Sequence, residues 1–108
     1  MVVDHETAYR IINQYVSEVK EALPVDKVYL YGSYAKGTAQ WDSDVDLCFF
    51  SNSFNLEDIV GITEKLFELK RRFNQYLCLE PNAFPLSEID NDNPFVKEIL
   101  RTGVEIII

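Results

Sequence analysis

The sequence predicts one α/β domain in which a small mixed sheet is flanked by helices. Segments with apolar residues at helical spacing alternate with short runs of β-branched and aromatic residues, a pattern typical of this class. The chain has 108 residues, a length that suits one core, so residues 1–108 are expected to form a single domain. No repeat, linker or low-complexity tract interrupts the alternation.

Three segments have the pattern of amphipathic helices. The first is expected over residues 4–23, where apolar residues recur at helical spacing until Pro24 ends the helix. The second covers residues 56–73 and ends in basic side chains, which suit a helix C-terminus. The third begins at Pro94, because proline is favoured at the first helical position, and ends at Gly103.

Four apolar runs between these helices predict strands. Residues 27–31 (KVYLY) and 45–50 (VDLCFF) are rich in β-branched and aromatic side chains and end at turn-forming residues. A third strand is expected over residues 75–80, stopped by Pro81. Residues 104–108 (VEIII) supply a fourth strand at the end of the sequence.

Charge and composition exclude several classes of function. The chain carries 18 acidic and 10 basic side chains, and its formal charge of −8 repels a phosphate backbone, so we expect no long nucleic acid as a partner. A basic protein is the better expectation. No apolar run is long enough to span a bilayer and no signal-peptide pattern opens the sequence, which predicts a cytoplasmic protein without membrane contact.

Two acids, Asp44 and Asp46, lie at the start of the second predicted strand. Because side chains alternate along a strand, Asp44 and Asp46 project to one side, while Val45 and Leu47 project to the other. Neighbouring carboxylates repel one another unless a cation compensates their charge. Carboxylates together with substrate phosphates are the usual ligands of Mg²⁺, so the pair predicts a metal–nucleotide site.

A Gly-Ser pair follows the first predicted strand and completes the motif. Gly32 allows a ligand to approach the backbone, and Ser33 opens a short helical turn, a position that favours an anion. Lys36 could add a positive charge. Taken alone, Gly-Ser is most often only a turn and Asp-x-Asp only a solvated strand edge. At this spacing between two apolar strands, the two together favour a phosphate and metal site.

The segment GSYAKGTAQWDSDVDL resembles the signature of the minimal nucleotidyltransferases of the DNA polymerase β-like superfamily, in which Gly-Ser precedes Asp-x-Asp. Residues 76–106 resemble the C-terminal half of these proteins, so the resemblance implies the polymerase β-like nucleotidyltransferase fold. It also implies a third metal ligand and catalytic acid on the following strand, a role that falls to Glu80. Two positions depart from the family, which commonly has arginine in place of Lys36 and often has aspartate in place of Glu80.

The resemblance further implies a two-metal mechanism with ATP as the substrate. Asp44 and Asp46 would bridge two Mg²⁺ ions, and Glu80 would complete the site beside the attacking hydroxyl. Gly32 and Ser33 would hold the departing phosphates. These residues are the expected catalytic, metal-binding and nucleotide-binding set, with Lys36 added on the nucleotide side.

Minimal members of this family resemble the antitoxins of toxin–antitoxin pairs whose toxin is a small helical HEPN-type ribonuclease. The activity implied is transfer of AMP from ATP to a tyrosine hydroxyl of that toxin, within a hetero-oligomer of the two proteins. The alternative is a non-catalytic nucleotide-binding module that neutralises its partner by masking it. Three clustered acids favour the enzyme.

Several conspicuous residues are interpreted as structural. His5 is expected to be an ordinary solvated residue, and Trp41 is expected to pack its loop against the domain. Cys48 and Cys78 are expected to be buried thiols without a disulfide, further from the strand mouth than the acids. Residues 70–72 (KRR) are expected to form a solvated helix end.

Overall fold

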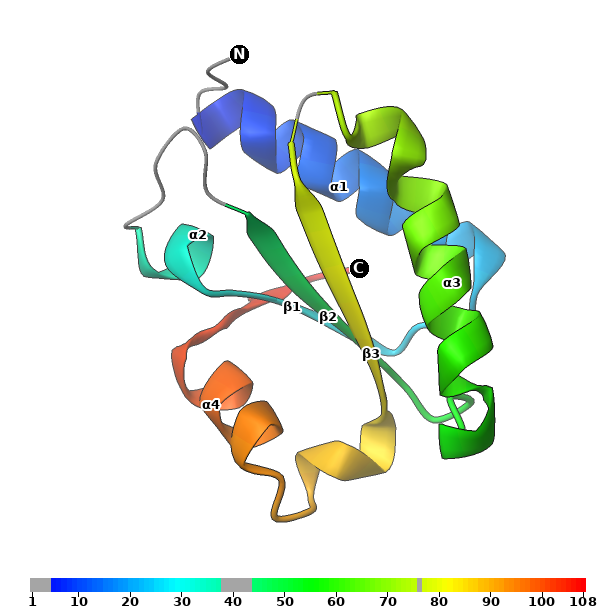
Figure 1. The fold of residues 1–108 in the computed structure, drawn as a ribbon. Coiled ribbons are helices and arrows are strands. Elements are labelled where there is room, and N and C mark those ends of the chain that lie inside the picture. Colours follow the sequence, from blue (N-terminus) through cyan, green and yellow to red (C-terminus); the bar gives the residue numbers. More distant parts are fainter. Residues whose placement is uncertain (1–4, 38–43, 76) are drawn as a thin grey trace.

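The computed structural model describes the chain over residues 5–37, 44–75 and 77–108 (Figure 1). Helices and strands alternate along it, as predicted. In chain order the elements, including three short 3-10 turns (η), are α1 (His5–Ala22), β1 (Lys27–Tyr31), α2 (Ser33–Lys36), β2 (Val45–Ser51), η1 (Leu56–Asp58), α3 (Ile59–Lys70), η2 (Arg71–Phe73), β3 (Leu79–Pro85), η3 (Leu86–Ile89), α4 (Pro94–Thr102) and β4 (Val104–Ile106).

Within the described ranges the strands form a four-stranded mixed sheet in the order β3-β2-β1-β4. β1 is antiparallel to both of its neighbours, β2 and β4. β2 and β3 are parallel, and α3 lies in the crossover between them, since parallel strands need a long connection. The predicted α/β class with a small mixed sheet flanked by helices is therefore confirmed.

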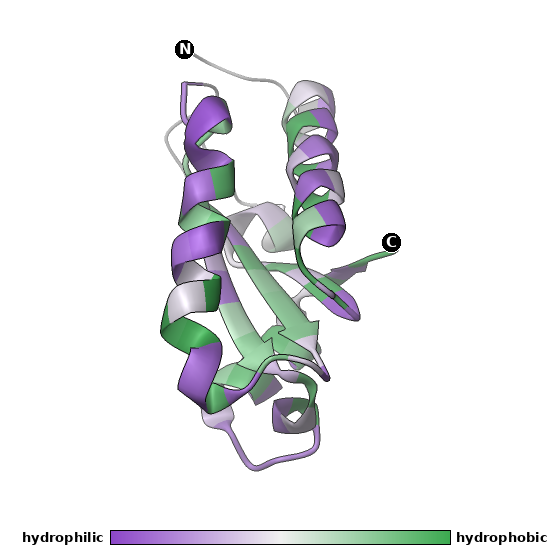
Figure 2. Ribbon diagram, turned by 90° about the vertical axis from the view of Figure 1, so that its right-hand side faces the viewer, coloured by the Kyte–Doolittle hydropathy of each residue, from purple (hydrophilic) through white to green (hydrophobic). Residues whose placement is uncertain are grey.

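One face of the sheet packs against α1 and α3, which lie on the same side of it in Figure 1. The inward-facing strand residues form the main core with these helices, and they are Val28, Leu30, Val45, Leu47, Phe49, Leu79 and Ala83. The Tyr15 hydroxyl of α1 donates to the Leu66 carbonyl of α3 at 2.8 Å and ties the two helices together. Figure 2 shows the apolar strands behind helices whose outer sides are largely hydrophilic.

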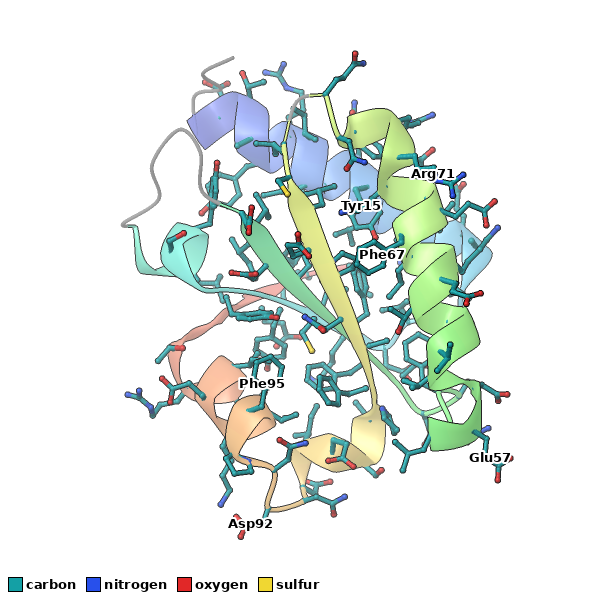
Figure 3. All side chains as sticks on the ribbon, in the orientation of Figure 1. Tyr15, Glu57, Phe67, Arg71, Asp92 and Phe95 are labelled. Atoms are coloured by element: carbon teal, nitrogen blue, oxygen red, sulfur yellow. The ribbon has the colours of Figure 1, made fainter. Side chains whose placement is uncertain are left out.

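The other face of the sheet is covered by α4 and the 3-10 turn before it. Cys48 and Phe50 of β2 are buried there against Val96 and Ile99 of α4. Phe95 points from α4 toward the sheet in Figure 3. Asp46 of β2 also points to this face, because its neighbours Val45 and Leu47 point to the α1 and α3 side and side chains alternate along a strand.

Most predicted boundaries agree with the structure to within one or two residues. The first predicted helix, 4–23, is α1, and the segment 56–73 is α3 with a 3-10 turn at each end. The fourth strand is shorter than predicted, since it ends at Ile106. No helix in the described part of the chain is both long and apolar enough to cross a membrane.

The predicted third strand, 75–80, was wrong because Pro81 does not end it. β3 runs from Leu79 through Pro81 to Pro85 and forms one edge of the sheet. The Cys78 carbonyl accepts from the Val45 amide of β2 at 2.8 Å, whereas the Leu79 carbonyl accepts from a lysine on the outer side. Backbone groups alternate in direction along a strand, so both prolines have their nitrogens turned away from β2. They cost no ladder hydrogen bond there and block further strand pairing.

Lys70 was also predicted wrongly as part of a solvated helix end. Its side chain is buried at the end of α3, and the ammonium group donates to the Leu79 carbonyl at 2.7 Å. The same nitrogen lies 4.6 Å from the centre of the Phe67 ring, a cation–π contact. Arg71 and Arg72 are exposed as predicted. Lys70 thus fixes the start of β3 against α3, directly before Glu80.

Candidate functional site

The register of three strands brings the main site residues into one row across the sheet. Tyr31 lies opposite Asp46 in the antiparallel pair β1–β2, and Asp46 lies beside Glu80 in the parallel pair β2–β3. Neighbouring strands are about 4.8 Å apart. Asp46 and Glu80 are therefore neighbours on the face that α4 partly covers, and Asp44 precedes them on β2's side of the site.

Cys78 lies among these acids, where it was not expected. The Sγ atom of Cys78 and one carboxylate oxygen each of Asp44 and Glu80 all lie within 4.8 Å of one another. Cys78 is exposed, so its predicted burial was wrong, whereas Cys48 is buried as predicted, and both are free thiols. Cys78 was predicted inside the third strand, whereas β3 begins at Leu79 and Cys78 precedes it, with its side chain exposed.

Gly32 is the residue that lets Asp46 enter the site. Its backbone has φ +74° and ψ −151°, a conformation that only glycine adopts readily. A Cβ atom at this position would clash with Oδ2 of Asp46, so the missing side chain makes room for the carboxylate. The sequence predicted Gly32 as a point of close approach, and the structure shows that a side chain of the protein itself uses that space.

The short helix predicted after Gly32 is present as α2. Ser33 is its first residue and is half-buried, directly after Gly32. Gly37 ends the helix in the left-handed conformation, and its amide donates to carbonyls of the same turn. The side chain of Lys36 lies outside the described part of the structure, as do Trp41 and the side chain of His5.

The negative charges of Asp44, Asp46 and Glu80 repel one another. Partial burial raises the pKa of Asp46, and the negative charges of Asp44 and Glu80 raise it further. The pKa of the Cys78 thiol is raised to about 11 by desolvation, by hydrogen bonds and charge from Asp44, and by Glu80. Each of these shifts disfavours an anion in the absence of a cation.

The sequence did not predict a polar pair next to the acids, formed by Asn82 and Tyr31. The Asn82 amide nitrogen of β3 donates to the Tyr31 hydroxyl of β1 at 2.7 Å, across the intervening β2. Burial raises the pKa of Tyr31 to about 12, and the charge of Asp46 adds to this effect. The Phe95 ring packs edge-on against the Tyr31 ring with centroids 5.8 Å apart. Strand alternation could have placed Asn82 with Glu80, had Pro81 not been taken as the end of the strand.

The donor set fits a divalent cation. Asp44 and Glu80 offer carboxylate oxygens to a common space, and Asp46 beside them is destabilised as an anion by both. Carboxylate oxygens are the protein ligands that Mg²⁺ prefers, and its remaining ligands are commonly water and substrate phosphates. A bound cation would relieve the repulsion that the structure contains.

Acids at the mouth of a mixed sheet, beside a glycine-led helical turn, define a domain of the metal-dependent phosphoryl and nucleotidyl transfer class. A family model, the nucleotidyltransferase domain, matches residues 12–103. The chain therefore belongs to the polymerase β-like family of nucleotidyltransferase domains. The matched residues include the acid row, by which we mean Asp44, Asp46 and Glu80, together with Gly32 and Ser33.

A solved structure supports the same fold. The crystal structure of a candidate nucleotidyltransferase from Sulfolobus solfataricus matches with a TM-score of 0.61 and 19% sequence identity. The match covers 89% of this chain and 76% of that chain. A search of the curated proteins found no match. At this identity the likeness shows the architecture alone.

We predict that Gly32→Ala destabilises the chain and displaces Asp46. The backbone conformation alone should cost about 1–3 kcal/mol, and the contact with Asp46 Oδ2 adds to it. Urea unfolding measures the loss. Gly61→Ala is the matched control, because Gly61 is helical with open space around it, and alanine there should stabilise the chain by up to about 1 kcal/mol. Equal stability of Gly32→Ala and the wild type would contradict the role given to Gly32.

We also predict that Asp46→Asn changes how stability depends on pH. Folding raises the pKa of Asp46, so the folded chain binds this proton more tightly. The resulting stabilisation is present below the ordinary aspartate range and is lost as the pH rises through the raised pKa. In chelator, the free energy of unfolding of the wild type should fall relative to that of Asp46→Asn as the pH rises above the ordinary aspartate range.

Urea unfolding at a series of pH values measures this difference. Asp58→Asn is the control, since it removes an exposed carboxylate on η1, away from the cluster. Asp46→Asn should be the more stable protein at neutral pH, and saturating Mg²⁺ should reverse the order by stabilising only the wild type. Parallel pH profiles of the wild type and Asp46→Asn would show that the acids do not repel one another.

Proposed function

We propose that this nucleotidyltransferase domain transfers AMP from ATP to a tyrosine hydroxyl of a HEPN-type ribonuclease toxin, and so acts as its antitoxin. The observation that carries the proposal is the acid row, Asp44, Asp46 and Glu80, beside Gly32 and Ser33 in a domain of this family. Bound Mg²⁺ would activate the attacking hydroxyl and neutralise charge on the triphosphate.

The reaction is a displacement at the α-phosphorus of ATP. The tyrosine oxygen forms a bond to the α-phosphorus, and the bond between that phosphorus and the oxygen bridging to the β-phosphate breaks. The electron pair of the broken bond leaves with pyrophosphate, and the tyrosine proton passes to a base. Glu80 is the candidate for this base, because it lies beside Asp46 on β3, the edge strand of the sheet.

The other residues bind and orient the nucleotide. Asp44 and Asp46 hold the metal from the start of β2. Gly32 and Ser33 lie across from them at the turn into α2, where backbone amides and a hydroxyl can meet the β- and γ-phosphates. Lys36 is one turn further along the same helix and would add a positive charge to this side.

The choice of a protein acceptor rests on charge and on sequence resemblance. A net charge of −8 disfavours a nucleic acid and favours a basic protein surface. The resemblance to antitoxins of HEPN-type toxins supplies the specific partner and the tyrosine acceptor. A hetero-oligomer of the two proteins would hold that tyrosine against the acid row.

We expect Asp44→Asn combined with Asp46→Asn to abolish transfer of label from α-labelled ATP to the toxin, because the metal loses ligands from β2. The fold should persist, since the replaced charges repel one another in the metal-free chain. Transfer is measured by incorporation of label into the co-purified toxin. The same variant is tested for rescue of growth against the toxin.

The paired measurements separate an enzyme from a masking module. An enzyme requires that the folded double variant lose both transfer and rescue. Asp90→Asn combined with Asp92→Asn is the matched control, since it removes two exposed charges at the loop before α4 and should retain both. Full rescue by a folded Asp44/Asp46 variant that transfers no AMP would overturn the enzymatic function and favour masking by binding.

A further inference from the structure

The Cys78 thiol lies beside two of the proposed metal ligands, Asp44 and Glu80. Its Sγ atom and carboxylate oxygens of Asp44 and Glu80 are all within 4.8 Å of one another. Ligands at about 2.0–2.3 Å from a tetrahedral ion lie about 3.3–3.8 Å from one another. The three atoms can therefore converge on one ion after side-chain shifts of about 1 Å, which the exposed side chains of Asp44 and Cys78 allow.

The backbone of the sheet sets this arrangement. The Val45 amide donates to the Cys78 carbonyl at 2.8 Å, which fixes Cys78 beside the start of β2, where Asp44 is. Cys78 and Glu80 are two residues apart and share a side, and the thiol donates to Oε1 of Glu80 at 3.6 Å. Exposure of Cys78 leaves the sulfur open to an incoming ion.

We propose that Cys78 joins Asp44 and Glu80 as a ligand of the divalent cation, so that this site binds a thiophilic ion of the Zn²⁺ class more tightly than it binds Mg²⁺. Mg²⁺ takes oxygen ligands, whereas a sulfur ligand favours Zn²⁺ and Cd²⁺. Binding replaces the S–H bond with a sulfur–metal bond and releases the proton to solvent. The inference rests on the proposed metal site, and it adds a choice of metal to it.

Cd²⁺ alone is the probe, because it forms a sulfur-to-metal charge-transfer band in the ultraviolet that oxygen ligands do not give. The purified chain should show this band with saturation at one Cd²⁺ per chain. Cys78→Ser should abolish it. Cys48→Ala is the matched control and should retain it, since Cys48 is fully buried against α4.

Two further variants show whether the sulfur acts with the acids. Asp44→Asn and Glu80→Gln should each weaken Cd²⁺ binding at least about 10-fold, and excess Mg²⁺ should compete with Cd²⁺ for the site. A band that survives in Cys78→Ser, or that has the same midpoint in both acid variants, would overturn the proposal.

The Cd²⁺ band and AMP transfer in Mg²⁺ test different proposals, so either one can fail without the other. Loss of transfer with an intact Cd²⁺ band would remove the proposed function and leave this metal site. Transfer without the band would do the reverse, because the acids would then bind Mg²⁺ with no part played by the sulfur.

Discussion

The pairing of β2 with an antiparallel strand on one side and a parallel strand on the other is the constraint on which the site depends. This register sets Tyr31, Asp46 and Glu80 in one row, and a shift of one residue would turn the Asp46 side chain into the core. The core on the α1 and α3 side fixes the register, because the alternating residues Val45, Leu47 and Phe49 must be buried there.

Several separate features hold the edge strand in this register. Lys70 anchors the Leu79 carbonyl from α3, and the prolines of β3 turn their nitrogens to the open edge. Asn82 reaches across β2 to the hydroxyl of Tyr31. These contacts hold Glu80 beside Asp46, although Glu80 lies on an edge strand with one neighbour.

The acids cost the metal-free protein stability that the rest of the fold supplies. Asp46 is half-buried, its pKa is raised, and it occupies the space that a side chain at position 32 would fill. A fold selected only for stability would avoid three acids at this position. A bound cation would offset this repulsion and would attract the triphosphate of a nucleotide, so the groups that lower the stability of the metal-free protein are those that the proposed function needs.

Local patterns predicted much of this arrangement. Alternation of apolar residues and the Asp-x-Asp spacing placed β2 and its acids, and Gly32 with the following turn was evident from Gly-Ser after a strand. The extent of β3 was not predictable from its prolines, since whether proline ends a strand depends on which way its nitrogen faces. Exposure of Cys78 and burial of Lys70 follow from that same edge position, which only the assembled sheet defines.

Whether Asp44, Asp46 and Glu80 form a metal–nucleotide site can be measured by calorimetry of ATP binding. ATP should bind appreciably in Mg²⁺ and only weakly in excess chelator, because clustered carboxylates repel a bare triphosphate and a cation joins the two. Equal affinity for ATP in Mg²⁺ and in chelator would contradict a site built on these acids.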